Sequence, residues 1–192
     1  DYALEIALIQ IEKEITIVKL KENYLNDFIS DILSGNIQSK EELLIRAKLF
    51  DIDIDGYSSV IIFDIDNYKY SIVQKPLENI KLEEIKRKMF EKIIQNFELL
   101  KSKVLYYKKS DSLVLITKHN SSDNTLLNEL EFLVSKLKKI IKSDFNFTFT
   151  VGMGNIQKDI MDINKSYEEA LDCIKIGRLL EENDGIFKYD DI

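Results

Sequence analysis

The order of hydrophobic patterns along the chain predicts an α+β fold of the ferredoxin-like class, with a mixed or antiparallel sheet, flanking helices and a long helix in front. Three observations support this prediction: a heptad pattern at the N-terminus, segments in the order β-α-β-β-α-β-α-β, and a tight hairpin between the second and third strands. A chain of 192 residues fits one domain with an appended helical segment. We expect residues 1–52 to form an N-terminal linker and coiled coil, and residues 53–192 to form the globular domain.

The first element is a helix predicted over residues 2–33. Apolar residues recur at alternating steps of four and three as far as Ile32, with Glu22 as the single polar break, which is the seam of a coiled coil. We expect the first half of the helix to join two copies of the chain in a homodimer, and the second half, Asn23–Leu33, to dock on the globular body. The alternative is that the whole helix packs on its own domain. The expected dimer contacts are Leu4, Leu8, Ile11, Ile15 and Val18.

The next helices and strands are predicted from helix-capping residues and from hydrophobic periodicity. Gly35 suits a left-handed helix cap, and Ser39 with Glu42 forms a capping box for a short helix at Glu41–Phe50. The first strand is predicted at Ser58–Asp66. Further along, we expect a loop at 67–79 that holds Pro76, a helix at 82–100, strands at 103–107 and 112–117 joined by a tight connection at 108–111, a helix at 126–142, a strand at 145–151, a helix at 164–180 and a strand at 186–189.

Two carboxylates at alternate positions end the first strand. Side chains alternate faces along a strand, so Asp64 and Asp66 project the same way. We expect both to be exposed at the mouth of the sheet, near Lys109–Asp111, with a divalent cation, a basic partner or water offsetting their repulsion.

Composition excludes several classes of function. The net charge of −7 argues against direct nucleic-acid binding. No apolar run is long enough for a membrane span, and no signal peptide is visible. The single cysteine, Cys173, is expected to be a buried helix residue, and the single histidine, His119, is expected in a polar loop without a nucleophile around it, so we expect a cytoplasmic location. A solvated helix face is expected for a group of lysines: Lys136, Lys138, Lys139 and Lys142.

The pattern around the two carboxylates resembles the GGDEF domain of diguanylate cyclases, which hold divalent cations over GTP. Asp64, Asp66 and Lys69 match the family's Asp-x-Asp strand end and lysine. The signature hairpin, however, reads Lys109-Ser110-Asp111-Ser112-Leu113, so both glycines are missing and Ser112 replaces the metal-binding acid. The resemblance with these departures implies that the chain is not an enzyme and uses no cofactor. The candidates for a vestigial nucleotide or magnesium site are Asp64, Asp66, Lys69 and Asp111; an active diguanylate cyclase is the less favoured alternative.

A narrower resemblance covers nearly the whole chain. Segments in the right order are similar to CdaR/PucR-type transcriptional regulators, which control sugar-diacid or purine catabolism: Ile29–Asn36, Glu42–Asp53, Val151–Gly154, Ser166–Leu171, Ile176–Leu180 and Tyr189–Ile192. AraC-type regulators of the YesN kind share the Ser166–Ala170 segment, which we expect to be architectural, with the Tyr167 ring turned inward and its hydroxyl at the rim.

The resemblance implies a function for the chain. In these regulators a degenerate GGDEF-like domain lies between an N-terminal sensor and a C-terminal helix-turn-helix. We therefore expect this chain to be the middle piece of a bacterial regulator, a non-catalytic signalling and dimerisation module whose partners are those two domains.

Overall fold

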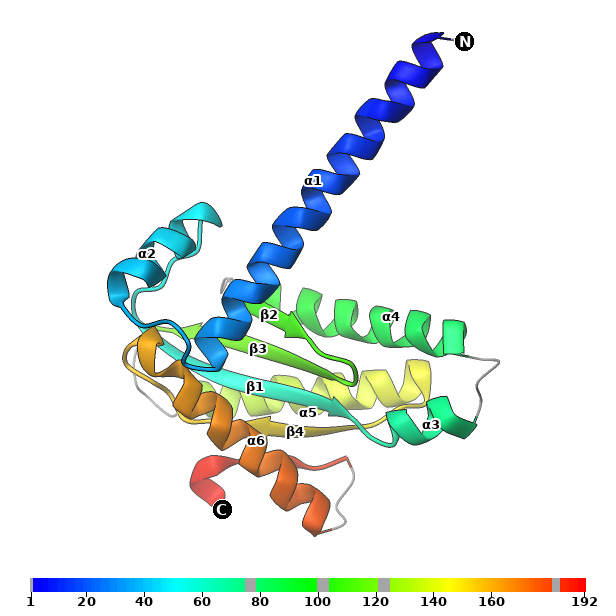
Figure 1. Cartoon of the computed structure of the whole chain (residues 1–192). Helices are drawn as coiled ribbons and strands as arrows, with labels where there is room; N and C mark the ends of the chain where they lie inside the picture. The colour runs from blue at the N-terminus through cyan, green and yellow to red at the C-terminus, as the bar shows by residue number, and fades with distance from the viewer. Residues whose placement is uncertain (1, 75–78, 100–103, 121–124, 181–183) are drawn as a thin grey trace. The chain divides into compact units, whose positions relative to one another are not determined.

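A computed structural model of the chain describes residues 2–74, 79–99, 104–120, 125–180 and 184–192 (Figure 1). The loop proline Pro76 and residues 100–103, where a helix and a strand were expected to end and begin, lie outside the described residues. The chain divides into two compact units, Asp1–Asp53 and Ile54–Ile192. Among the described residues, the helices lack the combination of length and apolar character that crossing a bilayer requires.

The first unit contains two helices, α1 (Tyr2–Leu33) and α2 (Lys40–Leu49). Gly35 has a φ of 67°, the left-handed conformation that ends α1. Ser39 Oγ accepts a hydrogen bond of 3.1 Å from the Glu42 N–H and so caps α2. The long N-terminal helix and the capping serine were both predicted from the sequence.

The second unit is built on a five-stranded sheet in the order β2-β3-β1-β4-β5. Neighbouring strands are antiparallel except for β4 and β5, which are parallel, so the sheet is mixed as predicted. The central strand β1 carries almost continuous apolar side chains because it is covered on both faces. The strands are β1 (Tyr57–Ile65), β2 (Leu105–Lys108), β3 (Ser112–His119), β4 (Phe149–Met153) and β5 (Ile186–Lys188).

Helices lie on both faces of this sheet (Figure 1). On one face α4 (Asn79–Glu98) and α5 (Thr125–Phe145) enclose the main core, where Phe63 meets the rings of Phe97 and Phe149 edge-to-face. On the other face lies α6 (Ile163–Leu179), in which Cys173 is fully buried as expected. One short 3₁₀ turn, Ile160–Asp162, precedes α6, and a second, Tyr189–Asp191, follows β5.

Helix α6 lies unusually close to β4 because glycines replace side chains between them. A Cβ built on Gly152 would overlap the carbonyl oxygen of Ala170, and one on Gly154 would overlap the carbonyl oxygen of Ser166. The close approach lets Ser166 Oγ accept a hydrogen bond of 2.9 Å from the Val60 N–H, inside the sheet. The position of α6 is therefore fixed by backbone contact as well as by side-chain packing.

Two elements differ from the sequence prediction. Where a loop was expected at 67–79, the chain forms α3 (Tyr68–Gln74), because Asn67, with a φ of 57°, turns the chain and Tyr68 and Ile72 pack one helical turn apart on the core. Where a strand was expected from residue 145, α5 continues to Phe145. Asn146, with a φ of 57°, ends that helix, and β4 starts only at Phe149.

Two polar residues also differ from expectation. His119 was expected in a polar loop, but it is the last residue of β3 and is 8% exposed. Its Nε2 lies 2.8 Å from Ser59 Oγ and 3.2 Å from Thr117 Oγ1, so buried hydroxyls compensate for its burial. Lys138, expected on a solvated face, has a side chain only 9% exposed, because it pairs with Asp184 beside the sheet.

We predict that Gly152→Ala destabilises the protein by about 2 kcal/mol or more, because the new methyl group meets backbone that cannot move without displacing α6. A matched control is Gly177→Ala, whose methyl would meet the partly exposed Phe187 ring and not a backbone atom, while alanine favours the helix. Urea unfolding of both variants measures the difference. Equal losses of stability would contradict the account of close packing at β4.

Candidate functional site

The acidic residue Asp64 is paired with an arginine from the far end of α6. It is the penultimate residue of β1, opposite Ser112 of β3 and Thr150 of β4. Arg178, in the last turn of α6, donates a hydrogen bond of 2.5 Å to Asp64 Oδ2. The Asp64 side chain is 13% exposed, so the expectation that it is exposed at the mouth of the sheet is wrong.

The environment of Asp64 favours its neutral form. Burial raises the pKa of Asp64 from 3.8 to about 6, and the negative charges of Asp111 and Asp66 add to the shift, while Arg178 opposes it. Within the described part of the chain, Asp64 Oδ1 is buried without a hydrogen-bond donor. A carboxylate in this position gains from any additional positive charge that can reach that oxygen.

The hairpin acid Asp111 has a basic partner of its own. Lys69 of α3 lies 2.8 Å from Asp111 Oδ2, and the Asp111 carbonyl accepts a 2.9 Å hydrogen bond from the Ile65 N–H. Burial alone would raise the pKa of Asp111, but hydrogen bonds from Lys69 and Ser110 lower it below its ordinary value. The hairpin therefore lies beside the end of β1, as the sequence predicted.

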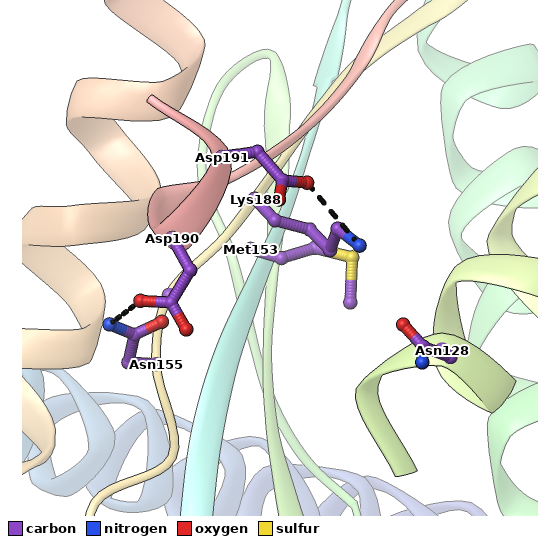
Figure 2. Close-up of a pocket in the computed structure, with 7 residues that line it drawn as sticks. Asn128, Met153, Asn155, Lys188, Asp190 and Asp191 are labelled. Atoms are coloured by element: carbon purple, nitrogen blue, oxygen red, sulfur yellow. Dashed lines mark hydrogen bonds and ion pairs between the residues drawn. The ribbon is translucent and has the colours of Figure 1, made fainter. Parts of the chain in front are cut away.

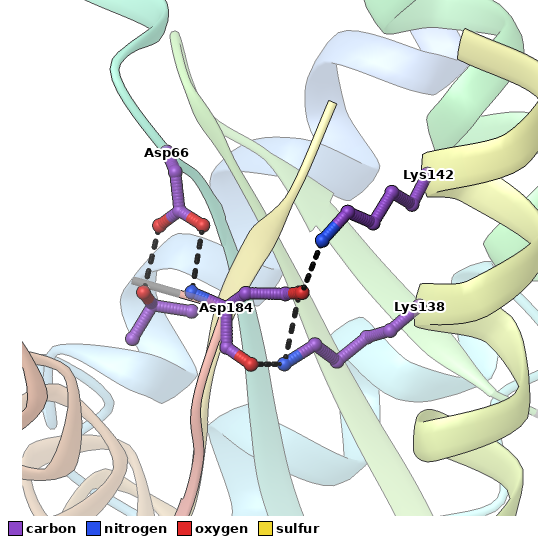
Figure 3. Close-up of polar contacts among 5 residues, drawn as sticks. Asp66, Lys138, Lys142 and Asp184 are labelled. Carbon is purple, nitrogen blue, oxygen red and sulfur yellow. Dashed lines mark hydrogen bonds and ion pairs between the residues drawn. The ribbon is translucent and has the colours of Figure 1, made fainter. Parts of the chain in front are cut away.

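Asp66 serves as an acceptor that holds the chain after α6 (Figure 3). It lies just beyond β1 and is only 7% exposed. Thr150 Oγ1 donates to Asp66 Oδ1 at 2.7 Å, and the Asp184 N–H donates to Asp66 Oδ2 at 3.0 Å. Both carboxylate oxygens are thus occupied by donors from β4 and from the segment before β5, contrary to the expectation of an exposed side chain.

Asp184 is held in turn by two lysines of α5. Lys138 lies 3.1 Å from Asp184 Oδ1 and also donates to the Asp184 carbonyl, and Lys142 lies 3.5 Å from Oδ2 (Figure 3). Burial lowers the pKa of Lys138, and the Asp184 carboxylate opposes that shift. The network joins β1, β4, α5 and the segment before β5. These structural contacts explain why an acidic side chain is buried at position 66.

The hairpin turn is tied to α6. The Lys109 N–H donates to the Ser112 carbonyl at 2.8 Å and closes the turn. The Lys109 ammonium donates to the Tyr167 hydroxyl and lies 5.1 Å from the centre of that ring. Tyr167 is 8% exposed, which fits the expected inward ring.

A separate small cavity of about 110 Å³ lies where the end of β4 meets the last residues of the chain (Figure 2). Its polar groups are largely paired with one another: Asn155 Nδ2 donates to Asp190 Oδ1 at 2.7 Å, and Lys188 lies 3.3 Å from Asp191. Lys188 also pairs with Glu131 at 3.0 Å, and this contact raises the pKa of Lys188. These side-chain pairs therefore join β4 to the C-terminal turn, and the cavity offers few unpaired polar groups to a ligand.

Magnesium binding can be tested against these residues. The described residues contain no group of three or more histidine, cysteine or acidic side chains arranged to hold a metal ion. The unpartnered Oδ1 of Asp64 nevertheless fits one ligand position of a magnesium ion, which proteins often bind through one or two carboxylates together with substrate phosphates. A single carboxylate oxygen does not by itself make a metal site, so among the described residues Asp64 Oδ1 is the one feature on which such a site would depend.

Comparisons with known proteins identify the class. The model of the GGDEF-like domain family matches residues 34–176, more than half of the chain, so the chain belongs to that family. No curated protein matches the chain. Among solved structures, it is similar to the active GGEEF domain of a diguanylate cyclase from Vibrio cholerae, with 14% identity and a TM-score of 0.50 over 76% of this chain and 88% of that one. An EAL/GGDEF domain protein from M. capsulatus is similar at 12% identity and a TM-score of 0.43, over 70% and 85%.

These findings correct one prediction. The expectation that the chain is not an enzyme is contradicted, because the chain belongs to the GGDEF-like family and its fold is similar to that of the GGEEF domain of a diguanylate cyclase. The fold prediction itself, a cyclase-like mixed sheet that a long helix precedes in the sequence, is confirmed.

Sequence reasoning did not find the partners of the site's acids. Arg178 belongs to the family segment Ile176–Leu180, and nothing in its local pattern indicates that it reaches Asp64, 114 positions away in sequence. The available signal was its position in the last turn of a helix, where a basic side chain is favoured in any case.

We predict that Asp64 makes stability fall as the pH rises. The pKa of Asp64 is about 6 in the folded protein against 3.8 ordinarily, so between these values the folded state binds more protons than the unfolded state. Relative to Asp64→Asn, the wild type should lose about 2 kcal/mol of unfolding free energy between pH 4 and pH 7. Urea unfolding of both proteins across this range measures it. A difference that stays constant, or that grows in favour of the wild type, would contradict the burial argument.

Proposed function

We propose that the chain is a signalling and dimerisation module of a bacterial transcriptional regulator of the CdaR/PucR type. In this proposal α1 joins two copies and couples an N-terminal sensor to a C-terminal helix-turn-helix. The observation that carries the proposal is an exposed apolar seam on α1.

The seam consists of large apolar residues that lie on one face of α1. Five successive seam residues are each at least half exposed, between 50% and 64%: Leu4, Leu8, Ile11, Ile15 and Val18. A repeat of 3.5 residues over this length is what two helices need to pack as a coiled coil. Toward the C-terminal end of α1 the seam residues are buried, since Ile29 and Ile32 are 1% and 4% exposed. The uncovered stretch therefore coincides with the part predicted to pair.

Contacts inside the first unit support a coupling role for α1. The end of α1 and α2 are joined by the Arg46–Asp31 ion pair at 2.7 Å. The Arg46 guanidinium also lies 5.0 Å from the centre of the Phe28 ring, which stacks on Phe50. A change in how two α1 helices pair would therefore reach α2 through these contacts.

The regulator assignment rests on the family segments together with the domain family. The GGDEF-like match spans in full three of the six segments that resemble CdaR/PucR regulators, namely Glu42–Asp53, Val151–Gly154 and Ser166–Leu171. The net charge of −7 favours leaving DNA contacts to a separate helix-turn-helix domain. The sequence on either side of this segment would distinguish a CdaR/PucR parent from a YesN-like one.

A second candidate function is binding of a guanine nucleotide with magnesium at the end of β1. The observation that favours it is the buried, unpartnered Oδ1 of Asp64 beside Asp66 and Asp111. A bound magnesium ion would neutralise phosphate charge there. Asp64 would hold the ion, Lys69 is close enough to the site to contribute positive charge, and Arg178 would have to release Asp64.

We predict that Leu8→Lys with Ile15→Lys converts the protein from a dimer to a monomer, because two charges enter the centre of the seam. Sedimentation equilibrium at tens of micromolar measures the molar mass, and the wild type should have that of two chains. The matched control is Ile9→Lys with Ile17→Lys, the same kind of change off the seam, which should leave the dimer intact. A wild type that sediments as a monomer, or equal effects of the two double variants, would refute dimerisation through this seam.

The second candidate predicts heat on titration of the protein with GTP in the presence of Mg²⁺. Asp64→Asn should abolish that heat, and Arg178→Ala should increase the affinity several-fold because it frees the carboxylate. Chromatography of the same mixtures shows whether a cyclic dinucleotide forms. Heat that is unchanged in Asp64→Asn, or absent even in Arg178→Ala, would exclude this site.

A further inference from the structure

Helix α1 carries a second apolar face that the proposed coiled coil would leave uncovered. At about 100° per residue, this face lies roughly 180° from the seam. Its side chains are between 43% and 78% exposed: Tyr2, Ile6, Ile9, Ile17, Leu20 and Tyr24. A helix that is apolar on opposite faces is one that is covered on both.

The second face follows a different repeat from the seam. Its positions step by four, three and four residues and then repeat, so Tyr2, Lys13 and Tyr24 are spaced eleven apart. An eleven-residue repeat has 3.67 residues per turn, close to the 3.6 of a straight helix, so the face runs almost parallel to the helix axis. A long partner helix can lie along it without following the left-handed coil of the seam.

Two polar strips keep the faces apart. Glu5, Glu12 and Lys19 lie on one side of the helix, and Gln10, Glu14 and Lys21 lie on the other. A helix that rests on a lipid surface has one apolar and one polar face. The opposed arrangement of α1 therefore favours helical partners on both sides over a membrane surface.

Lys13 determines which helix fits. It is the one polar position of the second face and lies at its centre. If two copies met in register through this face, parallel or antiparallel, Lys13 would face Lys13, and a charged residue in an apolar seam decides which partner is accepted. An acidic side chain at that position would instead form a pair partly shielded from water.

We propose that the second face of α1 binds an amphipathic partner helix that carries an acidic side chain opposite Lys13. The partner would add to the dimer formed by the seam. This proposal goes beyond the proposed function, because the seam would join two copies of this chain and the second face would bind a different helix.

The test uses the protein itself as the probe. Wild type and Lys13→Glu should each sediment as the dimer, because like charges meet at the second face. An equimolar mixture should form assemblies of at least twice the dimer mass, because Lys13 now faces a glutamate. Ile9→Lys with Ile17→Lys in both components should return the mixture to the dimer.

Lys21→Glu is the matched control, since it makes the same charge change on a polar strip, and its mixture with wild type should remain dimeric. The proposal is overturned if the Lys13→Glu mixture stays at the dimer mass, if the Lys21→Glu mixture grows equally, or if wild type alone forms tetramers that Ile9→Lys with Ile17→Lys dissociates. Failure of the seam would appear separately, as monomers in every unmixed sample.

Discussion

The close approach of α6 to β4 is the constraint on which the rest of the globular unit depends. Since Gly152 and Gly154 leave no side chain between them, the helix backbone lies against the strand and its register is fixed. That register sets Ser166 against the β1 backbone, Tyr167 beside the hairpin lysine and Arg178 at the carboxylate of Asp64. One helix therefore contacts the strand, the turn and the acidic end of the sheet.

The acids at this edge of the sheet are each matched to a different basic or donor group. Asp64 faces Arg178, Asp111 faces Lys69, and Asp66 accepts hydrogen bonds from Thr150 and the Asp184 backbone. An ion pair in a buried position stabilises the fold only when the attraction between the charges exceeds the cost of removing them from water. The raised pKa of Asp64 indicates that its attraction to Arg178 does not fully compensate for the burial of the carboxylate. Among Asp64, Asp66 and Asp111 of this GGDEF-like fold, Asp64 is the one with a buried oxygen that no hydrogen-bond donor reaches among the described residues.

Patterns within single elements were predictable, and contacts between distant elements were not. The heptads of α1, the cap at Ser39 and the order of the strands along the chain follow from periodicity and from the residues that begin and end helices. Two boundaries were wrong because Asn67 and Asn146 adopt left-handed conformations that apolar alternation does not reveal. The partners Arg178 and Lys138 depend on where α6 and α5 settle on the sheet, which is a property of tertiary packing.

The central claim is that α6 supplies the counter-charge for Asp64, and a double-mutant cycle tests it most directly. Unfolding free energies at pH 7 for wild type, Asp64→Asn, Arg178→Gln and the double variant isolate the interaction between the two side chains. We expect a favourable coupling of about 1–3 kcal/mol, since the carboxylate is largely buried and its partner half exposed. Strictly additive effects of the two substitutions would contradict the claim.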